Sequence, residues 1–378
     1  MTANRDSSQT PVETPGEPHA ALPGELDVVV IGGGVAGLAG ALTLARARRS
    51  VLVVDSGEPR NAPASAAHGL LSRDGVAPLE LLRVGREEVT GYGGRIVSDR
   101  AVSARRVAGG FVVTTASGRE LRARRLLMTT GLVDELPEVA GLRERWGRDV
   151  LHCPYCHGWE FRDAPIGVLG GRPTSLHQTL LMQQWSSRVT LFLPTGSVLA
   201  EEDAERLAAR GITVVEGEVT ALDVVADRLA GVKLASGRRV AVAALVVAPR
   251  LVARAEVLSG LGLAPVEHPM GTGTYVASDA TGLTEVAGVW VAGNVTESMA
   301  TLPLAQAGGV RAAMAINADL VHADTEAAVA RHRSGASSNA LADTFGPTSE
   351  AEVCARAAGR HHHDLDWVLE PEGNEERR

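Results

Sequence analysis

The chain has three cysteines, and two of them, Cys153 and Cys156, are separated by two residues. A pair at this spacing can close a small disulfide ring or open to a dithiol, and a nearby cation or helix end can make one thiol reactive. His157 follows directly and is a candidate acid or base for the proton that thiol–disulfide exchange moves. The stretch 153–158, CPYCHG, is therefore a candidate redox centre. The rival interpretation is two buried structural cysteines beside a helix-capping or surface histidine.

The small number of cysteines also limits the other kinds of site. A secreted disulfide scaffold carries more cysteines, so three of them favour a reducing cytoplasm and one redox pair. A structural zinc site needs four ligands, and the sequence has no second CxxC, so we expect no metal. The third cysteine, Cys354, precedes His361–His363, and three adjacent histidines on a helix cannot all face one ion.

The composition indicates a two-domain α/β protein. The 378 residues are 45% hydrophobic and 22% charged, with 42 glycines and only 3% aromatics. A net charge of −8 argues against a nucleic-acid partner. Residues 1–24, rich in Pro, Ser, Thr and acids, predict a disordered tail and not a signal peptide. The uncharged run 28–45 is interrupted by glycines, and we expect no membrane segment.

A glycine-rich turn lies between a predicted strand and a predicted helix. Residues 27–31 are apolar and β-branched, as in a buried parallel strand. Gly32, Gly34 and Gly37 then fit GxGxxG, and an Ala- and Leu-rich helix is predicted over 38–47. In this motif the first glycine allows the tight turn, the second admits a pyrophosphate, and the third lets helix and strand pack closely.

The next strand completes a dinucleotide fingerprint. Residues 51–54 are apolar and end in Asp55, the position at which an acid binds the adenosine ribose. Strand, glycines, helix, strand and acid in this order predict a nucleotide site, although a glycine-rich turn without a ligand is the rival interpretation. The local motif leaves NAD and FAD open.

Two later segments favour FAD and a discontinuous domain. Residues 126–131 form an apolar strand ending at Gly131, and residues 288–294 form another, ending in Gly293-Asn294 before a helix-like segment at 303–314. The predicted fold is α/β, with two Rossmann-like, three-layer nucleotide-binding domains, the second inserted into the first. We expect an FAD-binding domain over 25–140 and 276–325, a CxxC-bearing pyridine-nucleotide-like domain over 141–275, and a C-terminal extension over 326–378.

Over residues 25–325 the chain resembles the thioredoxin-reductase-like FAD-dependent pyridine nucleotide–disulfide oxidoreductases. Within that class it is most similar to the gliotoxin- and holomycin-type dithiol oxidases. Two stretches carry this similarity: 153–160, CPYCHGWE, where thioredoxin reductases have Asp in place of His157, and 68–75, HGLLSRDG. The resemblance implies FAD as cofactor and a homodimer.

The resemblance also implies roles for single residues. Cys156 would lie over the flavin and Cys153 would exchange with the substrate sulfur, with His157 and His68 as further candidate catalytic residues. Asn294 stands where thioredoxin reductases usually have an Asp that contacts the ribityl chain, and its amide can still bind a hydroxyl. The expected cofactor contacts are Gly32, Gly34, Gly37, Asp55, Asn61, Gly131, Gly293, Asn294 and Gln306.

A second glycine-rich stretch departs from the nucleotide-binding pattern. After the predicted strand 165–169, Gly170 matches the first glycine, but Arg172 occupies the second position and Ser175 the third. The following strand, 189–193, ends in Pro194 and offers neither the acid expected for NAD nor the arginines expected for NADP. The sequence predicts an impaired nicotinamide site, which makes NADPH doubtful. A working site with unusual residues is the alternative.

These features predict a cytoplasmic oxidase of a small-molecule dithiol. Electrons would pass from the substrate to the cysteine pair, then to FAD, and finally to O2, which becomes hydrogen peroxide. One alternative is an NADPH-dependent disulfide reductase acting on a thioredoxin-like protein. A second alternative is a flavin-bound redox sensor or partner-binding protein whose CxxC only changes conformation.

Overall fold

A computed structural model describes residues 25–334, and the chain as far as Ala318 forms one compact unit. A seven-stranded sheet holds its first nucleotide-binding motif. The strands at its centre are parallel, and an antiparallel hairpin extends one edge. The strands are β1 (Leu26–Ile31), β2 (Val51–Asp55), β3 (Arg95–Ser98), β4 (Ala101–Val107), β5 (Gly110–Thr115), β6 (Glu120–Met128) and β19 (Val289–Val291).

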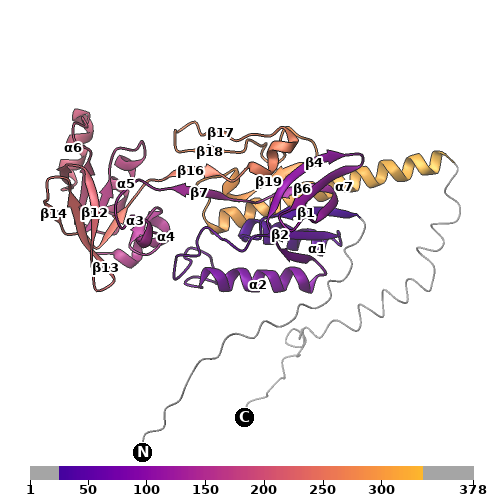
Figure 1. The fold of residues 1–378 in the computed structure, drawn as a ribbon, viewed down its shortest axis with the longest axis horizontal. Helices are drawn as coiled ribbons and strands as arrows, with labels where there is room; N and C mark the ends of the chain where they lie inside the picture. Colours follow the sequence, from indigo (N-terminus) through magenta and orange to yellow (C-terminus); the bar gives the residue numbers. More distant parts are fainter. Residues whose placement is uncertain (1–24, 335–378) are drawn as a thin grey trace, which may run out of the picture. The chain divides into compact units, whose positions relative to one another are not determined.

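Segments far apart in the sequence meet in this sheet. The late strand β19 pairs with the end of β6, so the orange part of the chain lies beside the purple part (Figure 1). The helices of this part are α1 (Val35–Arg46), α2 (Pro78–Gly91) and α7 (Leu302–Arg333). Glycines let α1 and α7 touch: a Cβ on Gly309 would lie 2.0 Å from the Ala36 carbonyl oxygen. This close packing fixes the start of α1, where the glycine turn ends.

A second, five-stranded sheet is entirely parallel. Its strands are β8 (Val150–Leu151), β9 (Ile166–Leu169), β10 (Val189–Leu193), β11 (Thr213–Glu216) and β15 (Ala244–Val246). A three-stranded antiparallel sheet follows β11: β12 (Val219–Val225), β13 (Arg228–Leu234) and β14 (Arg239–Val240). The helical elements are α3 (Leu142–Arg145), α4 (Pro154–His157), η1 (Trp159–Phe161), α5 (Ser175–Met182) and α6 (Glu201–Ala209).

A two-stranded ribbon, β7 (Leu132–Glu135) paired with β16 (Arg250–Ala253), marks where the chain leaves the first sheet and returns to it. The return comes earlier than the predicted residue 276, because Ala253, Val257 and Leu263 belong to the hydrophobic core of the first sheet. Four short elements complete this return: η2 (Glu256–Leu261), β17 (Val266–Glu267), β18 (Thr274–Tyr275) and η3 (Gly293–Val295).

The predicted fold class is confirmed: two Rossmann-like units, the second inserted into the first. The last helix is longer than the predicted 303–314, since α7 runs from Leu302 to Arg333. Among residues 25–334, no helix combines the length and hydropathy needed to cross a bilayer. The predicted tail 1–24, Cys354 and the histidines 361–363 lie outside the described residues.

Candidate active site

A cavity of about 1020 Å3 brings the glycine turn and the cysteine pair together. Its wall includes the turn 32–34, Asp55 at the end of β2, the segment 129–131 after β6, and the segment 152–157 that carries the cysteines. The volume is at the upper end of the range for ligand pockets in proteins. Both groups of residues that the sequence singled out therefore face one space.

The glycine turn is held rigidly and stays open towards the cavity. Gly32 has a φ of +105°, and its carbonyl accepts a hydrogen bond from the Thr129 hydroxyl at 2.7 Å. The Gly33 N–H donates to Asp55 Oδ1 at 3.0 Å, and Arg86 binds the other Asp55 oxygen. A Cβ on Gly34 would meet no atom within 4 Å. The turn can therefore admit a bulky phosphate group at the beginning of α1.

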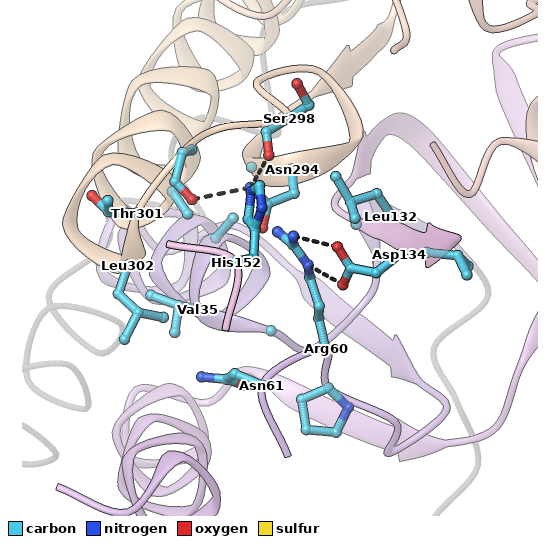
Figure 2. A pocket seen from close by; sticks show the side chains of 18 of the residues that line it. Val35, Arg60, Asn61, Leu132, Asp134, His152, Asn294, Ser298, Thr301 and Leu302 are labelled. Carbon is cyan, nitrogen blue, oxygen red and sulfur yellow. Dashed lines mark hydrogen bonds and ion pairs between the residues drawn. The ribbon is translucent and has the colours of Figure 1, made fainter. Parts of the chain in front are cut away.

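At another part of the wall, Asn294 organises a turn (Figure 2). Its side-chain Nδ2 donates to the carbonyls of Glu297, Ser298 and Ala300 at 3.1, 3.3 and 3.0 Å. The amide nitrogen is thus committed to the backbone, and only Oδ1 remains for a ligand. The buried Ser298 hydroxyl lines the same cavity without a hydrogen-bond partner. An unpartnered polar atom, an open glycine turn and the volume all fit a dinucleotide such as FAD.

The other predicted cofactor contacts divide into three groups. Asn61, Gly131 and Gly293 line the cavity. Gly37 allows α1 to pack closely against the glycine turn, since a Cβ there would lie 1.9 Å from the Gly32 carbonyl oxygen. Gln306 is exposed on α7 and is absent from the cavity wall.

The cysteine pair begins the short helix α4. Cys153 is its N-cap residue and Pro154 its first residue, and both thiols are free and partly buried. The hydrogen bond from the Cys156 side chain lowers the pKa of Cys153 to about 7, although burial opposes this. The N–H groups of Cys156 and Tyr155 and the charge of Arg60 also lower it. The same thiol–thiol hydrogen bond and burial raise the pKa of Cys156. Cys153 is therefore the thiolate of the pair at neutral pH.

The two predicted histidines both line the cavity. Burial lowers the pKa of His157, and the charge of Glu160 partly opposes the effect. His68 lies in the loop before α2, where its Nδ1 is 3.3 Å from Asp74 Oδ2 and its Nε2 is 3.4 Å from Glu160 Oε1. His157 is thus a neutral imidazole at pH 7, able to take up a proton beside the thiols. Within residues 25–334, no three His, Cys, Asp or Glu side chains gather as they would around a metal ion.

Three further residues at this site were not singled out from the sequence. Arg60 forms a bidentate ion pair with Asp134 of β7, with N–O distances of 2.8 and 2.6 Å (Figure 2). His152, directly before Cys153, lines the cavity, and burial lowers its pKa. Gln178 of α5 donates to the His152 carbonyl at 3.2 Å and so ties α5 to the cysteine segment. The position of Arg60 next to Asn61, and of His152 next to Cys153, was the available signal.

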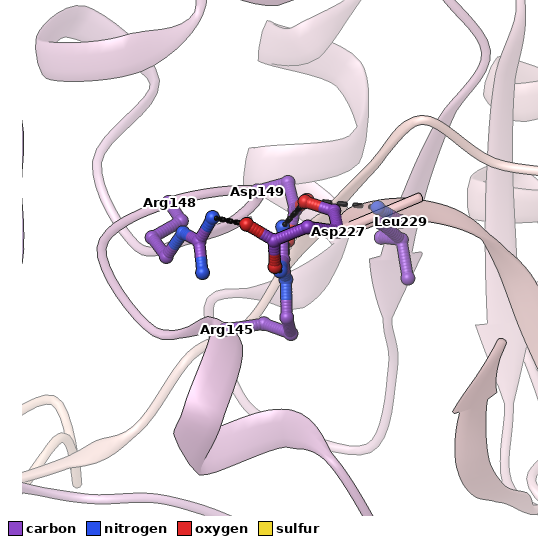
Figure 3. A network of polar contacts seen from close by, with 5 residues as sticks. All are labelled: Arg145, Arg148, Asp149, Asp227 and Leu229. Carbon is purple, nitrogen blue, oxygen red and sulfur yellow. Dashed lines mark hydrogen bonds and ion pairs between the residues drawn. The ribbon is translucent and has the colours of Figure 1, made fainter. Parts of the chain in front are cut away.

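A buried network supports the segment that leads to the cysteines (Figure 3). Arg145 Nε of α3 donates to Asp149 Oδ1 at 2.8 Å, and both side chains are over 90% buried. Asp149 also accepts the Leu229 N–H at 2.8 Å, and Asp227 in the turn between β12 and β13 binds Arg145 and Arg148. The network joins α3, the residue before β8 and the β12–β13 hairpin. It therefore positions β8, which leads into the cysteine segment.

Comparison with known proteins agrees with this geometry. The sequence model of the pyridine nucleotide-disulphide oxidoreductase family matches residues 26–309. Thioredoxin reductase sirT of Leptosphaeria maculans is 30% identical over 326 residues, which cover 82% of this chain and 98% of the relative. A probable thioredoxin reductase of Arthroderma benhamiae is 37% identical over 38% of this chain. The chain spans only 37–59% of the length of that protein and of two other curated relatives.

A solved structure extends the similarity to three dimensions. The crystal structure of HlmI is 45% identical and superimposes with a TM-score of 0.78, covering 84% of this chain and 99% of HlmI. The family match, the two Rossmann-like units and the cysteine pair beside a nucleotide cavity lead to one conclusion. The chain belongs to the pyridine nucleotide-disulphide oxidoreductase family.

Proposed function

We propose that the protein is a dithiol oxidase, which converts a small-molecule dithiol to a disulfide with O2 as the final electron acceptor. The observation that carries this proposal is the contrast between the two glycine turns. The first has Gly34 at its second position and lines the cavity that holds Cys153 and Cys156, whereas the second has Arg172 at that position and does not line this cavity. This contrast supports FAD as the cofactor and argues against a nicotinamide cofactor.

The second turn differs from the first at the positions that contact a dinucleotide. Arg172 puts a side chain where the motif has its second glycine, which a pyrophosphate approaches. The Arg172 N–H donates to the Ser175 hydroxyl at 3.3 Å. The neighbouring strand β10 is followed by Pro194, which offers neither an acid nor an arginine to the ribose. These differences argue against a nicotinamide cofactor at this turn.

The cysteines can carry out the exchange with balanced bonds and electrons. A substrate thiolate attacks Cys153 of the oxidised pair, forms a mixed disulfide, and expels Cys156 as a thiolate. The second substrate thiol loses its proton and attacks the mixed disulfide, which releases Cys153 as a thiolate and leaves the substrate oxidised by two electrons. The pKa of about 7 makes Cys153 a good leaving group in this step. A bound FAD would supply the acceptor for the electron pair of the cysteines, and O2 would be the final acceptor, taking up two protons to give H2O2.

His157 and His152 are the candidates for holding the substrate protons. Both line the cavity beside the cysteine pair, and burial lowers the pKa of each, so both are neutral bases at pH 7. His157 follows Cys156 on α4, and the resemblance to gliotoxin- and holomycin-type oxidases supports its role. A cytoplasmic location and a homodimer remain predictions from the sequence.

A second candidate function is an NADPH-dependent disulfide reductase acting on a thioredoxin-like protein. The names of the relatives favour it, since sirT and the Arthroderma benhamiae protein are both called thioredoxin reductases. A redox sensor that binds FAD without turnover is the remaining alternative.

Anaerobic flavin bleaching separates these functions. We expect a small dithiol to bleach the flavin absorbance within seconds and NADPH to leave it unchanged, with equimolar disulfide and H2O2 formed once air is admitted. Cys156→Ser should abolish turnover while flavin content is kept. Rapid bleaching by NADPH would support the disulfide reductase function. Absence of turnover with any dithiol would support the redox sensor.

A further inference from the structure

His68 is held between two carboxylates that come from different parts of the chain. Its Nδ1 lies 3.3 Å from Asp74 Oδ2 in its own loop, and its Nε2 lies 3.4 Å from Glu160 Oε1 in η1. The Gly69 N–H donates to Asp74 Oδ1 at 2.8 Å and fixes that carboxylate. Each ring nitrogen faces one carboxylate, so the imidazole can receive a proton at one nitrogen and give up a proton at the other.

These side chains differ in how far they are exposed to the solvent. His157, next to Cys156, is partly buried, and the side chains of His68, Glu160 and Asp74 are 23%, 37% and 67% exposed. His157 interacts electrostatically with both Glu160 and His68. Glu160 follows His157 by three residues, so a rotamer change or one water molecule can join the two side chains.

The proposed oxidation needs such a connection. Each substrate dithiol loses two protons at the cysteine pair, while the two protons that end in H2O2 are taken up in a later step. The reduced protein can keep part of these protons with the electron pair, and the remainder has to leave the cavity and return when O2 is reduced. A buried base beside the thiols can hold one proton, but it needs an exit before it can accept the next one.

We propose that Glu160, His68 and Asp74 form this exit, passing protons between His157 and the solvent. The inference rests on the proposed dithiol oxidation and extends it to residues that do not touch the thiols. In the outward direction, an N–H bond of the His157 imidazolium breaks and an O–H bond forms on Glu160. The proton then moves to His68 Nε2, and His68 passes the proton on its Nδ1 to the exposed Asp74 carboxylate. No electron moves along this route. His68 is a positioning and relay residue in this scheme.

A purely structural role for His68 makes a different prediction. As a clamp between the loop 68–75 and η1, it would affect how well the cavity holds a substrate, and its loss would raise KM with kcat unchanged. As a relay, its loss lowers the rate of proton exchange, and a small diffusible base can replace it.

The test is stopped-flow reduction of the FAD-loaded full-length protein by excess dithiothreitol, without oxygen, in weak buffer with a pH-indicator dye. Wild type, His68→Gln, Glu160→Gln and Glu205→Gln are compared. Glu205 is an exposed residue of α6 and serves as the matched charge-removal control. We expect proton release to slow at least about tenfold in His68→Gln and Glu160→Gln and, when it is read without the dye from the flavin bleaching that it limits, to recover on addition of imidazole. Glu205→Gln should match wild type.

Each of the other outcomes contradicts a defined part of the proposal. Normal proton release in His68→Gln, or slow release that imidazole does not restore, refutes the relay. A rise in KM alone, with kcat and the pH profile unchanged, also refutes it in favour of the clamp. If dithiothreitol reduces neither wild type nor control, the proposed oxidase function fails and the relay fails with it. Flavin content and Tm of each variant report whether the fold is kept.

Discussion

The two glycine turns follow the same course in the chain and differ in what surrounds them. Each comes after a buried parallel strand, β1 or β9, and leads into a helix. After Gly34 the helix α1 begins at once and runs for 12 residues, whereas Arg172, Pro173 and Thr174 separate the second turn from α5, which has 8 residues. Asp55 ends the strand beside the first turn, and Pro194 follows the strand beside the second.

The difference shows how a Rossmann unit can keep its fold while losing its ligand site. Strand pairing and core packing do not depend on the second glycine, because Ile166, Val168 and Leu191 are buried in either case. Ligand binding depends on open space above the turn and on unused N–H donors. At the second turn the Arg172 side chain occupies the position of the second glycine, and the Arg172 N–H already donates to Ser175. The inserted unit then contributes the cysteine pair and part of the cavity wall, through Thr174, Gln178 and Leu181.

The largest expected effect comes from putting the same charge on each turn. Gly34→Asp should weaken FAD binding at least about 100-fold, because a carboxylate would face the pyrophosphate. Since a Cβ at Gly34 meets no atom within 4 Å, the apoprotein should keep its Tm. Arg172→Asp is the matched variant and should leave FAD affinity unchanged. Titration of the apoproteins with FAD, followed by flavin fluorescence, measures both. Equal losses of FAD affinity in the two variants would show that the two turns do not differ in their contribution to FAD binding.

Substitutions in the inserted unit should change the free energy of unfolding without changing FAD affinity. Asp149→Leu removes the buried carboxylate that binds Arg145, leaves this arginine only the exposed Asp227, and should cost about 3–5 kcal/mol of unfolding free energy. Asp227→Asn, at a side chain that is 71% exposed, should lower the unfolding free energy far less, because solvent screens an exposed ion pair. Denaturant unfolding gives both values, and the FAD affinity of folded protein should be retained. A large loss of affinity in Asp149→Leu would mean that this network also shapes the first site.

The sequence predicted elements better than it predicted contacts. Hydrophobic runs and glycine spacing located β1, β2, β9 and β10, because buried parallel strands have a strong apolar signal. The ion pair of Arg60 with Asp134 joins residues 74 positions apart, and no local pattern reports such a pair. Asn294 was predicted as a ligand contact, yet its amide nitrogen binds three carbonyls of the turn that follows. Side-chain partners depend on the tertiary arrangement, which one sequence does not contain.

The cysteine pair lies between the two turns in the sequence. The pH dependence of its alkylation tests which of the two thiols is the more reactive. The pKa of Cys153 is lowered to about 7, so its thiolate fraction should rise about tenfold between pH 6 and pH 8 and then level off. Alkylation of the reduced protein by iodoacetamide, read by mass spectrometry, should follow that curve at Cys153. Cys156 should react slowly over the same range, because its pKa is raised. Faster reaction at Cys156 would reverse the assigned roles.

A smaller effect is expected where the first site departs from its relatives. Asn294→Asp replaces an N–H2 group that donates to three backbone carbonyls with an oxygen that faces them. The turn that carries Ser298 should loosen, at a cost of about 1–3 kcal/mol, with up to about tenfold weaker FAD binding. Thermal unfolding and FAD titration measure the two effects. Asn317→Asp is the control, since its side-chain oxygen accepts from Arg49 and a carboxylate can do the same. Unchanged FAD affinity in Asn294→Asp would show that the turn tolerates either residue.

The smallest expected effect on flavin bleaching comes from a substitution in the second glycine turn. Arg172→Gly restores glycine at the second position of the motif, and we still expect NADPH to leave the flavin unbleached under anaerobic conditions. The reason is that Pro194 still follows strand β10, so neither an acid nor an arginine becomes available for the ribose. Should Arg172→Gly alone permit bleaching, the Arg172 side chain would be the whole obstacle, and the inserted unit would be a nicotinamide site blocked at one position.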